Sequence, residues 1–364
     1  MFSYWILTLF AAISSFTATS VINAAPQQAA FQYLTADSVL LDVYEYNDRH
    51  GLLEGYRAHI LSPVCEDGLC YEAELDFEWD IIGKFIRFRV DPDKSLTKLD
   101  HVPFTQEDYD KLEKILLTES PSFIHLRRGE LVIPHDTAGE GEVDAMTGAT
   151  VKAVKKDMVE GAIYTCYTLW HIANGGIRFN IQQHSRQKLD EPLIRKLLAR
   201  NESGTSYFVV ENMSPAYFDV FLDELLTMAG TYDAFFLERM IHRIPNELLG
   251  TASVQNFFRQ HFHRLLPASQ EELIIRWEVT KQLDPSTLLF LTEQFKPQDA
   301  EYNHRIIKLI AEQDPSDKPE ILKQMVTVLC EREIAVPPES IILLDGLAEQ
   351  DRSLRKILKP LKKQ

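Results

Sequence analysis

The chain is short of positive charge. Its 364 residues include 38 Lys and Arg against 54 Asp and Glu, which gives a formal net charge of −16. Because the phosphates of nucleic acids are bound by clustered Lys and Arg, this balance argues against a nucleic-acid partner. Hydrophobic residues still make up 45% of the chain. We therefore expect a buried core, spread over one to three domains, and no extensive disorder.

Several signatures of catalytic and cofactor sites are also missing. The sequence has no Gly-x-Ser-x-Gly, no P-loop, no Rossmann fingerprint and no Cys-x-x-Cys-His for a c-type haem. A metal pair on a helix would need ligands at i and i+4, and no such set stands out around His242, His261 or His263. We expect these histidines to be surface or packing residues.

Charge is absent from the first part of the chain. Residues 1–23 contain no charged side chain, and Trp5 to Phe16 is a short apolar run. Ile22 and Ala24 suit the positions before a signal-peptidase cleavage site, although no Lys or Arg precedes the apolar run. The sequence therefore predicts a signal peptide over residues 1–24 and a periplasmic or otherwise exported protein. An uncleaved membrane anchor is the alternative, but polar residues keep the apolar run below spanning length: Ser14, Ser15, Thr17, Thr19 and Ser20.

Cysteine is scarce, with four residues at Cys65, Cys70, Cys166 and Cys330. The Asp-Gly pair between the first two is a hairpin-turn signal. In an exported protein, two Cys that flank a tight turn predict a local disulfide. Free thiols are the first alternative. A metal site is a weaker one, because no second Cys or His pair has zinc spacing.

The first half of the chain predicts an α+β domain. Residues 53–64, 71–79 and 84–90 alternate in part between apolar and polar side chains, as the strands of an antiparallel sheet do. Residues 38–46 fit either a strand or a helical turn. Thr105 is placed to cap a helix over residues 106–117, with Asp108 as the capping acid.

One stretch carries a specific chemical pattern. Asp144 is followed by two variable residues and then by Thr147, Gly148, Ala149 and Thr150. The two small residues allow a phosphate or a modifying enzyme to approach the backbone closely. On spacing alone, an ordinary helix N-cap at either threonine is the more common explanation.

Residues 151–174 are predicted to form one long helix with Thr150 at its start. The N-terminus of such a helix offers unpaired N–H groups that suit a phosphate. Four aromatic side chains crowd its second half, and we expect most of them to pack in the core: Tyr164, Tyr167, Trp170 and His171. The two glycines at 175 and 176 are a helix stop signal, and residues 177–181 are expected to add a last strand.

The pattern at 144–150 resembles the flavinylation motif of the FMN-binding domains of the sodium-translocating NADH:quinone reductase, the Rnf complex and related extracytoplasmic electron-transfer proteins. The resemblance extends over residues 65–176. It includes Cys70-Tyr71, the segment 96–104 with His101, and the run 164–171 with Tyr167. It does not cover the C-terminal half of the chain.

The resemblance implies that Thr150 carries FMN through a phosphoester bond. Asp144 would position the Thr150 hydroxyl or help to hold a metal during transfer, and Thr147, Gly148 and Ala149 would complete the cofactor-binding motif. His101 and Tyr167 are the further candidates for contact with the flavin, since flavins sit well against aromatic surfaces. A separate flavin transferase, redox partner proteins and a membrane-associated electron donor are the partners that follow.

From Leu189 onward, apolar residues recur at helical spacing and glycine becomes sparse. This region predicts an all-α array of helix pairs, for which a HEAT-like arrangement is the candidate, although no fixed-length sequence repeat is visible. The basic residues after Asp351 are typical of a solvated helix face, with a membrane surface or acidic partner as the alternative. The helices are expected at residues 191–200, 215–229, 232–244, 253–266, 270–283, 285–293, 301–313, 318–332 and 338–350.

Together these patterns predict a signal peptide at 1–24, an FMN-binding-like α+β domain at 25–185 and a helical array at 186–364. The function that we expect is an exported electron carrier with covalent FMN, rather than a substrate-specific enzyme. Two alternatives stay open: a helical scaffold or adaptor with an unmodified FMN-type domain, and a flavin-dependent reductase of a small acceptor.

Overall fold

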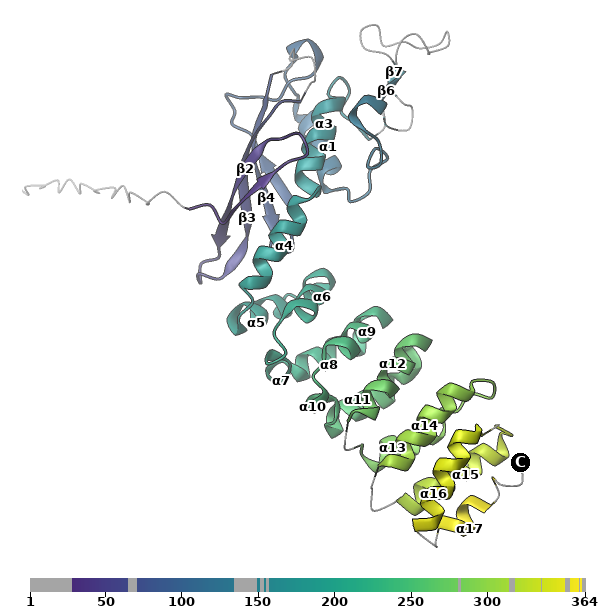
Figure 1. Cartoon of the computed structure of the whole chain (residues 1–364). Coiled ribbons are helices and arrows are strands. Elements are labelled where there is room, and N and C mark those ends of the chain that lie inside the picture. The colour runs from purple at the N-terminus through teal and green to yellow at the C-terminus, as the bar shows by residue number, and fades with distance from the viewer. Residues whose placement is uncertain are drawn as a thin grey trace, which may run out of the picture.

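The computed structural model describes residues 28–64, 71–133, 149–150, 154, 157–280, 283–313, 318–334, 336–350, 354–359 and 361. An antiparallel sheet with helices on one side comes first, and a long array of helices extends away from it (Figure 1). The predicted order of an α+β region followed by an all-α region is confirmed.

The sheet has five strands in the order β1-β2-β3-β4-β5, and each pairs antiparallel with the next. Alternate side chains of β3 and β4 are buried, which explains the period-two pattern of the sequence. Residues 38–46, which fitted a strand or a helical turn, contribute most of β2. The strands are β1 (Phe31–Leu34), β2 (Leu40–Asn47), β3 (Leu53–Ser62), β4 (Ala73–Asp80) and β5 (Phe85–Arg89).

Three helices accompany this sheet: α1 (Gln106–Leu117), α3 (Ile163–Asn174) and α4 (Ile177–Gln187). The predicted capping box of α1 is confirmed, because the Thr105 side chain accepts from Asp108 N and the Asp108 side chain accepts from Thr105 N. Helix α3 is fixed to the sheet by Trp79, whose indole Nε1 donates to the carbonyl of Ala173 at 2.7 Å.

Two local predictions are wrong. A single helix does not run from 151 to 174, because residues 157–162 form turns and α3 begins only at Ile163. Gly161 has a φ of +73°, a conformation that ends regular helix and that glycine adopts without strain. Residues 177–181 form the start of α4 rather than a strand. Ile177 and Ile181 are buried one helical turn apart, whereas Phe179 between them is exposed.

Helix α4 joins the sheet to the array. The Tyr56 hydroxyl lies 2.9 Å from Ser185 Oγ, and Ser185 Oγ donates to the Ile81 carbonyl at 2.7 Å. Lys196 of the next helix donates to the Leu53 carbonyl at 3.0 Å and pairs with Glu54 at 2.7 Å. Polar contacts from β3 and the β4–β5 turn therefore hold the first array helices in place.

The array is a stack of two helix rows (Figure 1). Helix α5 (Glu191–Ala199) pairs with α6 (Ser203–Asn212) at the start of the array, and its Arg195 also contacts Glu224. One row runs α6, α9 (Ala234–Arg243), α12 (Pro267–Glu278), α14 (Ala300–Glu312) and α16 (Pro338–Gln350). The other runs α8 (Leu222–Thr231), α11 (Ala252–His261), α13 (Pro285–Thr292), α15 (Lys318–Glu331) and α17 (Leu354–Leu358). Shorter helices are α7 (Tyr217–Val220) and α10 (Asn246–Leu249).

Every array helix that the sequence predicts has a counterpart in this stack. The prediction missed α6, a helix of ten residues. A repeat is also present. Helices α9, α12 and α14 begin at residues 234, 267 and 300, which are 33 residues apart. The same register recurs in the core, where side chains at intervals of 33 are buried: Phe208, Ile241, Ile274 and Ile307.

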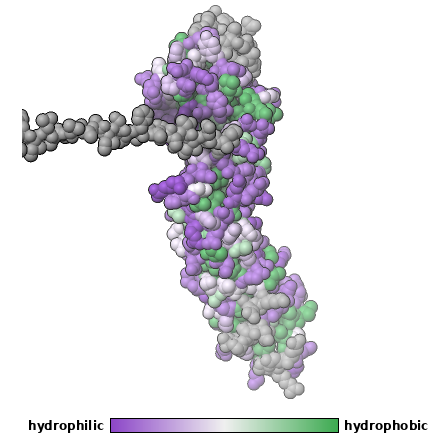
Figure 2. Space-filling model, turned by 90° about the vertical axis from the view of Figure 1, so that its left-hand side faces the viewer, coloured by the Kyte–Doolittle hydropathy of each residue, from purple (hydrophilic) through white to green (hydrophobic). Residues whose placement is uncertain are grey.

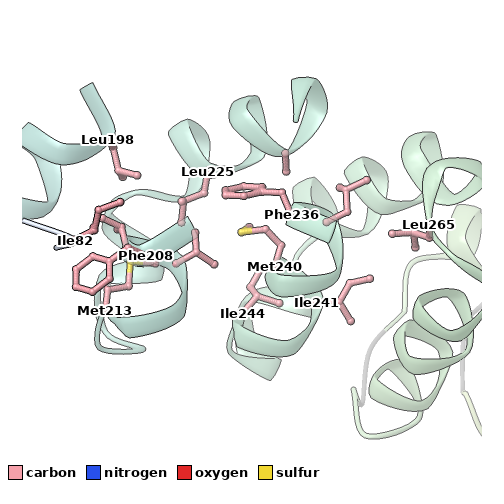
Figure 3. Packing of buried hydrophobic residues seen from close by; sticks show 14 of the residues in the cluster. Ile82, Leu198, Phe208, Met213, Leu225, Phe236, Met240, Ile241, Ile244 and Leu265 are labelled. Carbon is pink, nitrogen blue, oxygen red and sulfur yellow. The ribbon is translucent and has the colours of Figure 1, made fainter. Parts of the chain in front are cut away.

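Arginines reinforce the stacking of successive helices. Arg243 of α9 donates to the Met213 carbonyl at 3.1 Å, just beyond the end of α6. Arg276 of α12, 33 residues later, donates to the Ile244 carbonyl at 2.7 Å, just beyond the end of α9. The last carbonyls of a helix have no partner within the helix, so a neighbouring guanidinium satisfies them. Figure 3 shows the apolar side chains that fill the space between these helices.

Candidate functional site

The last residues of the flavinylation-like pattern lie on a short strand. Strand β7 (Ala149–Thr150) pairs antiparallel with β6 (Val132–Ile133), and Thr150 lies opposite Val132. Thr150 is therefore held by a β-ribbon and is not part of the helix α3 that sequence reasoning extended back to it. Asp144, Thr147 and Gly148 lie outside the described residues.

A single arginine ties the base of this ribbon to the rest of the domain. The turn η2 (Arg128–Glu130) comes just before β6. Arg128 Nη2 lies 2.8 Å from Asp37 Oδ2, in the β1–β2 turn, and 2.6 Å from Thr168 Oγ1 of α3. Arg128 thereby links three parts of the chain that are far apart in sequence. Sequence reasoning missed this residue, since nothing in its local pattern distinguishes it from other surface arginines.

Next to Thr168 lies a compact aromatic group, made of Phe123, Tyr167, Trp170 and His171. The rings of Tyr167 and His171 have centroids 4.2 Å apart, and the Trp170 ring meets His171 edge to face at 5.0 Å. Phe123 contacts both Tyr167 and Trp170. The polar ends of two members are used to fix their positions: Tyr167 donates to the Leu126 carbonyl at 2.9 Å, and Trp170 Nε1 donates to the Thr118 carbonyl at 2.8 Å.

His171 is the exception in this group. Its Nε2 atom is buried and has no hydrogen-bond partner among the residues that the structure describes. Burial lowers the pKa of this imidazole, an effect that Asp37 opposes and Arg128 assists. The ring is therefore neutral at pH 7. Burial also raises the pKa of the Tyr167 phenol, so that side chain stays protonated.

His101, the other predicted flavin contact, belongs to a different group. It ends the short turn η1 (Leu99–His101), has a φ of +58° and lies with its ring 4.2 Å from that of Tyr71. Leu99 N donates to the Gly161 carbonyl at 2.8 Å, so this turn packs on the loop before α3. Within the described part of the chain, no ring contact or hydrogen bond joins His101 to Tyr167.

We also looked among the described residues for a metal site and for a reactive thiol. No group of three or more His, Cys, Asp or Glu suited to a metal occurs among the described residues. Cys166 is buried with a free thiol, and burial raises its pKa to about 12, so it is not a nucleophile at neutral pH. Cys65 and Cys70 lie outside the described residues, and their disulfide stays a prediction.

A hollow of about 320 Å³ lies elsewhere, between the end of β5 and α1. Three carboxylates border it, from Asp91, Asp110 and Glu113, together with the rings of Phe88 and Tyr109. This lining disfavours an anion such as a phosphate. In the described residues, no helix is both long and apolar enough to cross a membrane.

The chain was compared with known protein families, curated proteins and solved structures, and none of them matches it.

Proposed function

We propose that the protein is an exported electron carrier in which Thr150 bears FMN through a phosphoester bond. The observation that carries the proposal is the order of residues in the sequence: an acid at 144, two variable residues, and then Thr147 to Thr150. The proposal includes Gly148 and Ala149 as the small residues that allow close approach of the phosphate.

The described residues around α3 fit the ring system of a flavin. A flavin ring is planar, largely apolar on its faces and polar along its edges. Of the group around His171, the half-buried rings of Tyr167 and His171 and the unpartnered Nε2 of His171 support contact with such a ring. When bound, the flavin would supply the electron-transfer chemistry. Tyr167 would border the ring, and Arg128 would hold α3 and the base of the ribbon in fixed relation.

The roles of Asp144 and His101 rest on the resemblance alone. In the proposal, Asp144 orients the Thr150 hydroxyl during attachment. His101 and Tyr71 form an exposed aromatic pair at the turn that packs on the loop before α3, and this pair is the second candidate surface for the flavin.

The proposed partners are a flavin transferase, redox partner proteins and a membrane-associated electron donor. The array is the part of the chain that we expect to select the redox partner, as stacked helix pairs of HEAT-like arrays present extended binding surfaces. On the side of the molecule shown in Figure 2, the described array surface is mostly hydrophilic with separate apolar patches. That surface suits reversible rather than permanent association.

The 33-residue repeat favours a second candidate function, a scaffold or adaptor whose α+β domain carries no flavin. Both functions use the array, and only the first requires a modified threonine. A flavin-dependent reductase with its own small acceptor is the third candidate, and it would differ from the carrier in turning over that acceptor.

The test is the intact mass and visible absorption of the exported protein after coexpression with a flavin transferase. We expect a mass increase of one FMN less one water, together with flavin absorption. Both should disappear in Thr150→Ala and persist in Thr137→Ala, a matched change outside the motif. An increase that survives Thr150→Ala refutes the attachment site, and no increase in the unaltered protein favours the scaffold.

A further inference from the structure

Ring contacts hold the His171 imidazole in place, but its Nε2 atom has no hydrogen bond to a described residue. The Tyr167 ring lies 4.2 Å away, and the Trp170 ring meets it edge to face at 5.0 Å. These contacts fix where the imidazole lies and use its apolar surface. They leave Nε2 buried without a hydrogen bond to any described residue. Buried polar atoms without partners are rare in folded proteins, and each one calls for an explanation such as a bound group.

The charged groups nearest to this imidazole are already engaged. Asp37 and Arg128 pair with each other at 2.8 Å, and Arg128 also donates to Thr168. The phenol of Tyr167 donates to a backbone carbonyl. None of these groups makes a hydrogen bond to Nε2, so we expect its partner outside the described residues.

We propose that Nε2 of His171 hydrogen-bonds the polar edge of the flavin ring carried by Thr150. This inference rests on the proposed function. Two connections favour it over an unrelated ligand. First, His171 lies on α3 one turn after Thr168, and Thr168 accepts a hydrogen bond from Arg128 of η2. Second, β6 follows η2 and pairs with β7, the strand that contains Thr150. The neutral imidazole can donate to a flavin carbonyl or accept from a flavin N–H, depending on its tautomer.

The role assigned to His171 is to position and tune the flavin, so its test needs a readout other than attachment. Three variants are compared with the unaltered protein after coexpression with a flavin transferase: His171→Phe, His171→Gln and His125→Phe. Phe keeps the ring and removes Nε2, whereas Gln retains a polar group at a similar reach. His125 is an exposed histidine close in sequence to Phe123 and serves as the control. Each protein is measured by intact mass and by its two-electron midpoint potential at pH 7.

We expect all four proteins to carry the mass of FMN. In His171→Phe the midpoint potential should move by at least about 30 mV, which corresponds to a tenfold change in the relative affinity for oxidised and reduced flavin. His171→Gln should move it less, and His125→Phe should leave it unchanged. A flavinylated His171→Phe protein with an unaltered potential overturns the inference. An unaltered protein without the mass of FMN overturns the inference and the proposed function together, and the mass identifies that case.

A second measurement needs no change at residue 171. The nitrogen NMR shift of His171 Nε2 is compared between the flavinylated protein and Thr150→Ala, which cannot be loaded at that site. A hydrogen bond to the flavin predicts different Nε2 shifts in the two proteins. Identical shifts, with the flavin mass present in the first protein, mean that the partner is buried water or a residue of segment 134–148, and the inference fails.

Discussion

The β4–β5 turn and the helical array share one hydrophobic core, and shortening Ile82 tests this directly. Ile82 lies in the turn after β4 and is only 9% exposed. Its Cδ1 atom would lie 3.3 Å from a Cβ atom placed on Gly204 of α6, so the two elements are in direct contact. Figure 3 shows Ile82 beside Leu198, Phe208 and Met213 of the first array helices.

The expected cost of Ile82→Ala follows from this burial. The substitution removes carbon atoms worth about 0.8 kcal/mol each on transfer from water, or roughly 2.4 kcal/mol for the three that Ala lacks. A cavity between two stacked elements collapses only partly and adds to that loss. We therefore expect the substitution to lower the free energy of unfolding by about 3 kcal/mol. Ile86→Ala is the control, because Ile86 is 39% exposed and should cost less than about 1 kcal/mol.

The assay combines urea denaturation with hydrogen–deuterium exchange. Exchange in Ile82→Ala should become faster both in β3 and in α6, since a shared core transmits the loss to both sides. Faster exchange in only one of these elements would show that the sheet and the array are separate cores. A loss no larger than that of Ile86→Ala would refute the burial argument itself.

The other predictions concern the array, the joint and the thiols. Arg276→Met should lower the free energy of unfolding by about 1–3 kcal/mol, because the carbonyl of Ile244 loses a charged donor; urea denaturation measures this, and an unchanged midpoint would contradict it. The hydrogen bond from Lys196 holds the pKa of Asp48 at about 2, below its usual 3.8. The stability from this pair is therefore complete above about pH 4 and is lost as the pH falls through 2. Asp48→Asn should flatten the acid loss of stability over that range, and an equally steep profile would count against the pair. Cys166 should resist maleimide at pH 8 until the protein is unfolded, because its pKa is about 12; labelling of the native protein at this residue, detected by peptide mass, would contradict its burial.

Local chemistry made much of the fold predictable. The alternation in β3 and β4 and the Thr105 capping box each rest on a few neighbouring residues, and the structure confirms them. The start of α13 is also marked locally, by Pro285 after the capping residue Asp284, whereas α12 begins at Pro267, three residues before the predicted start.

One error arose where a short pattern of apolar residues fits both a strand and a helix. Ile177, Phe179 and Ile181 alternate as a strand would, yet the helix that buries Ile177 and Ile181 also fits, and packing against the sheet selects it. The 33-residue repeat is hard to find in the sequence because most of its positions vary, as position 208 shows with Phe where 241, 274 and 307 have Ile.

The candidate site was predictable in part. The motif and the aromatic character of α3 are visible in the sequence. The pairing of Thr150 with Val132 and the bridge from Arg128 to Asp37 depend on long-range contacts that no local pattern encodes. The unpartnered nitrogen of His171 likewise exists only once α3 is packed against Phe123 and its neighbours.

The central claim is that Thr150 carries the flavin, and peptide mass spectrometry tests it most directly. Trypsin can release residues 129–152 as one peptide from the protein coexpressed with a flavin transferase. The account predicts that fragment ions place the mass of one FMN less one water on Thr150. An unmodified peptide, or fragment ions that place the added mass on Thr147 or Thr137, would contradict it.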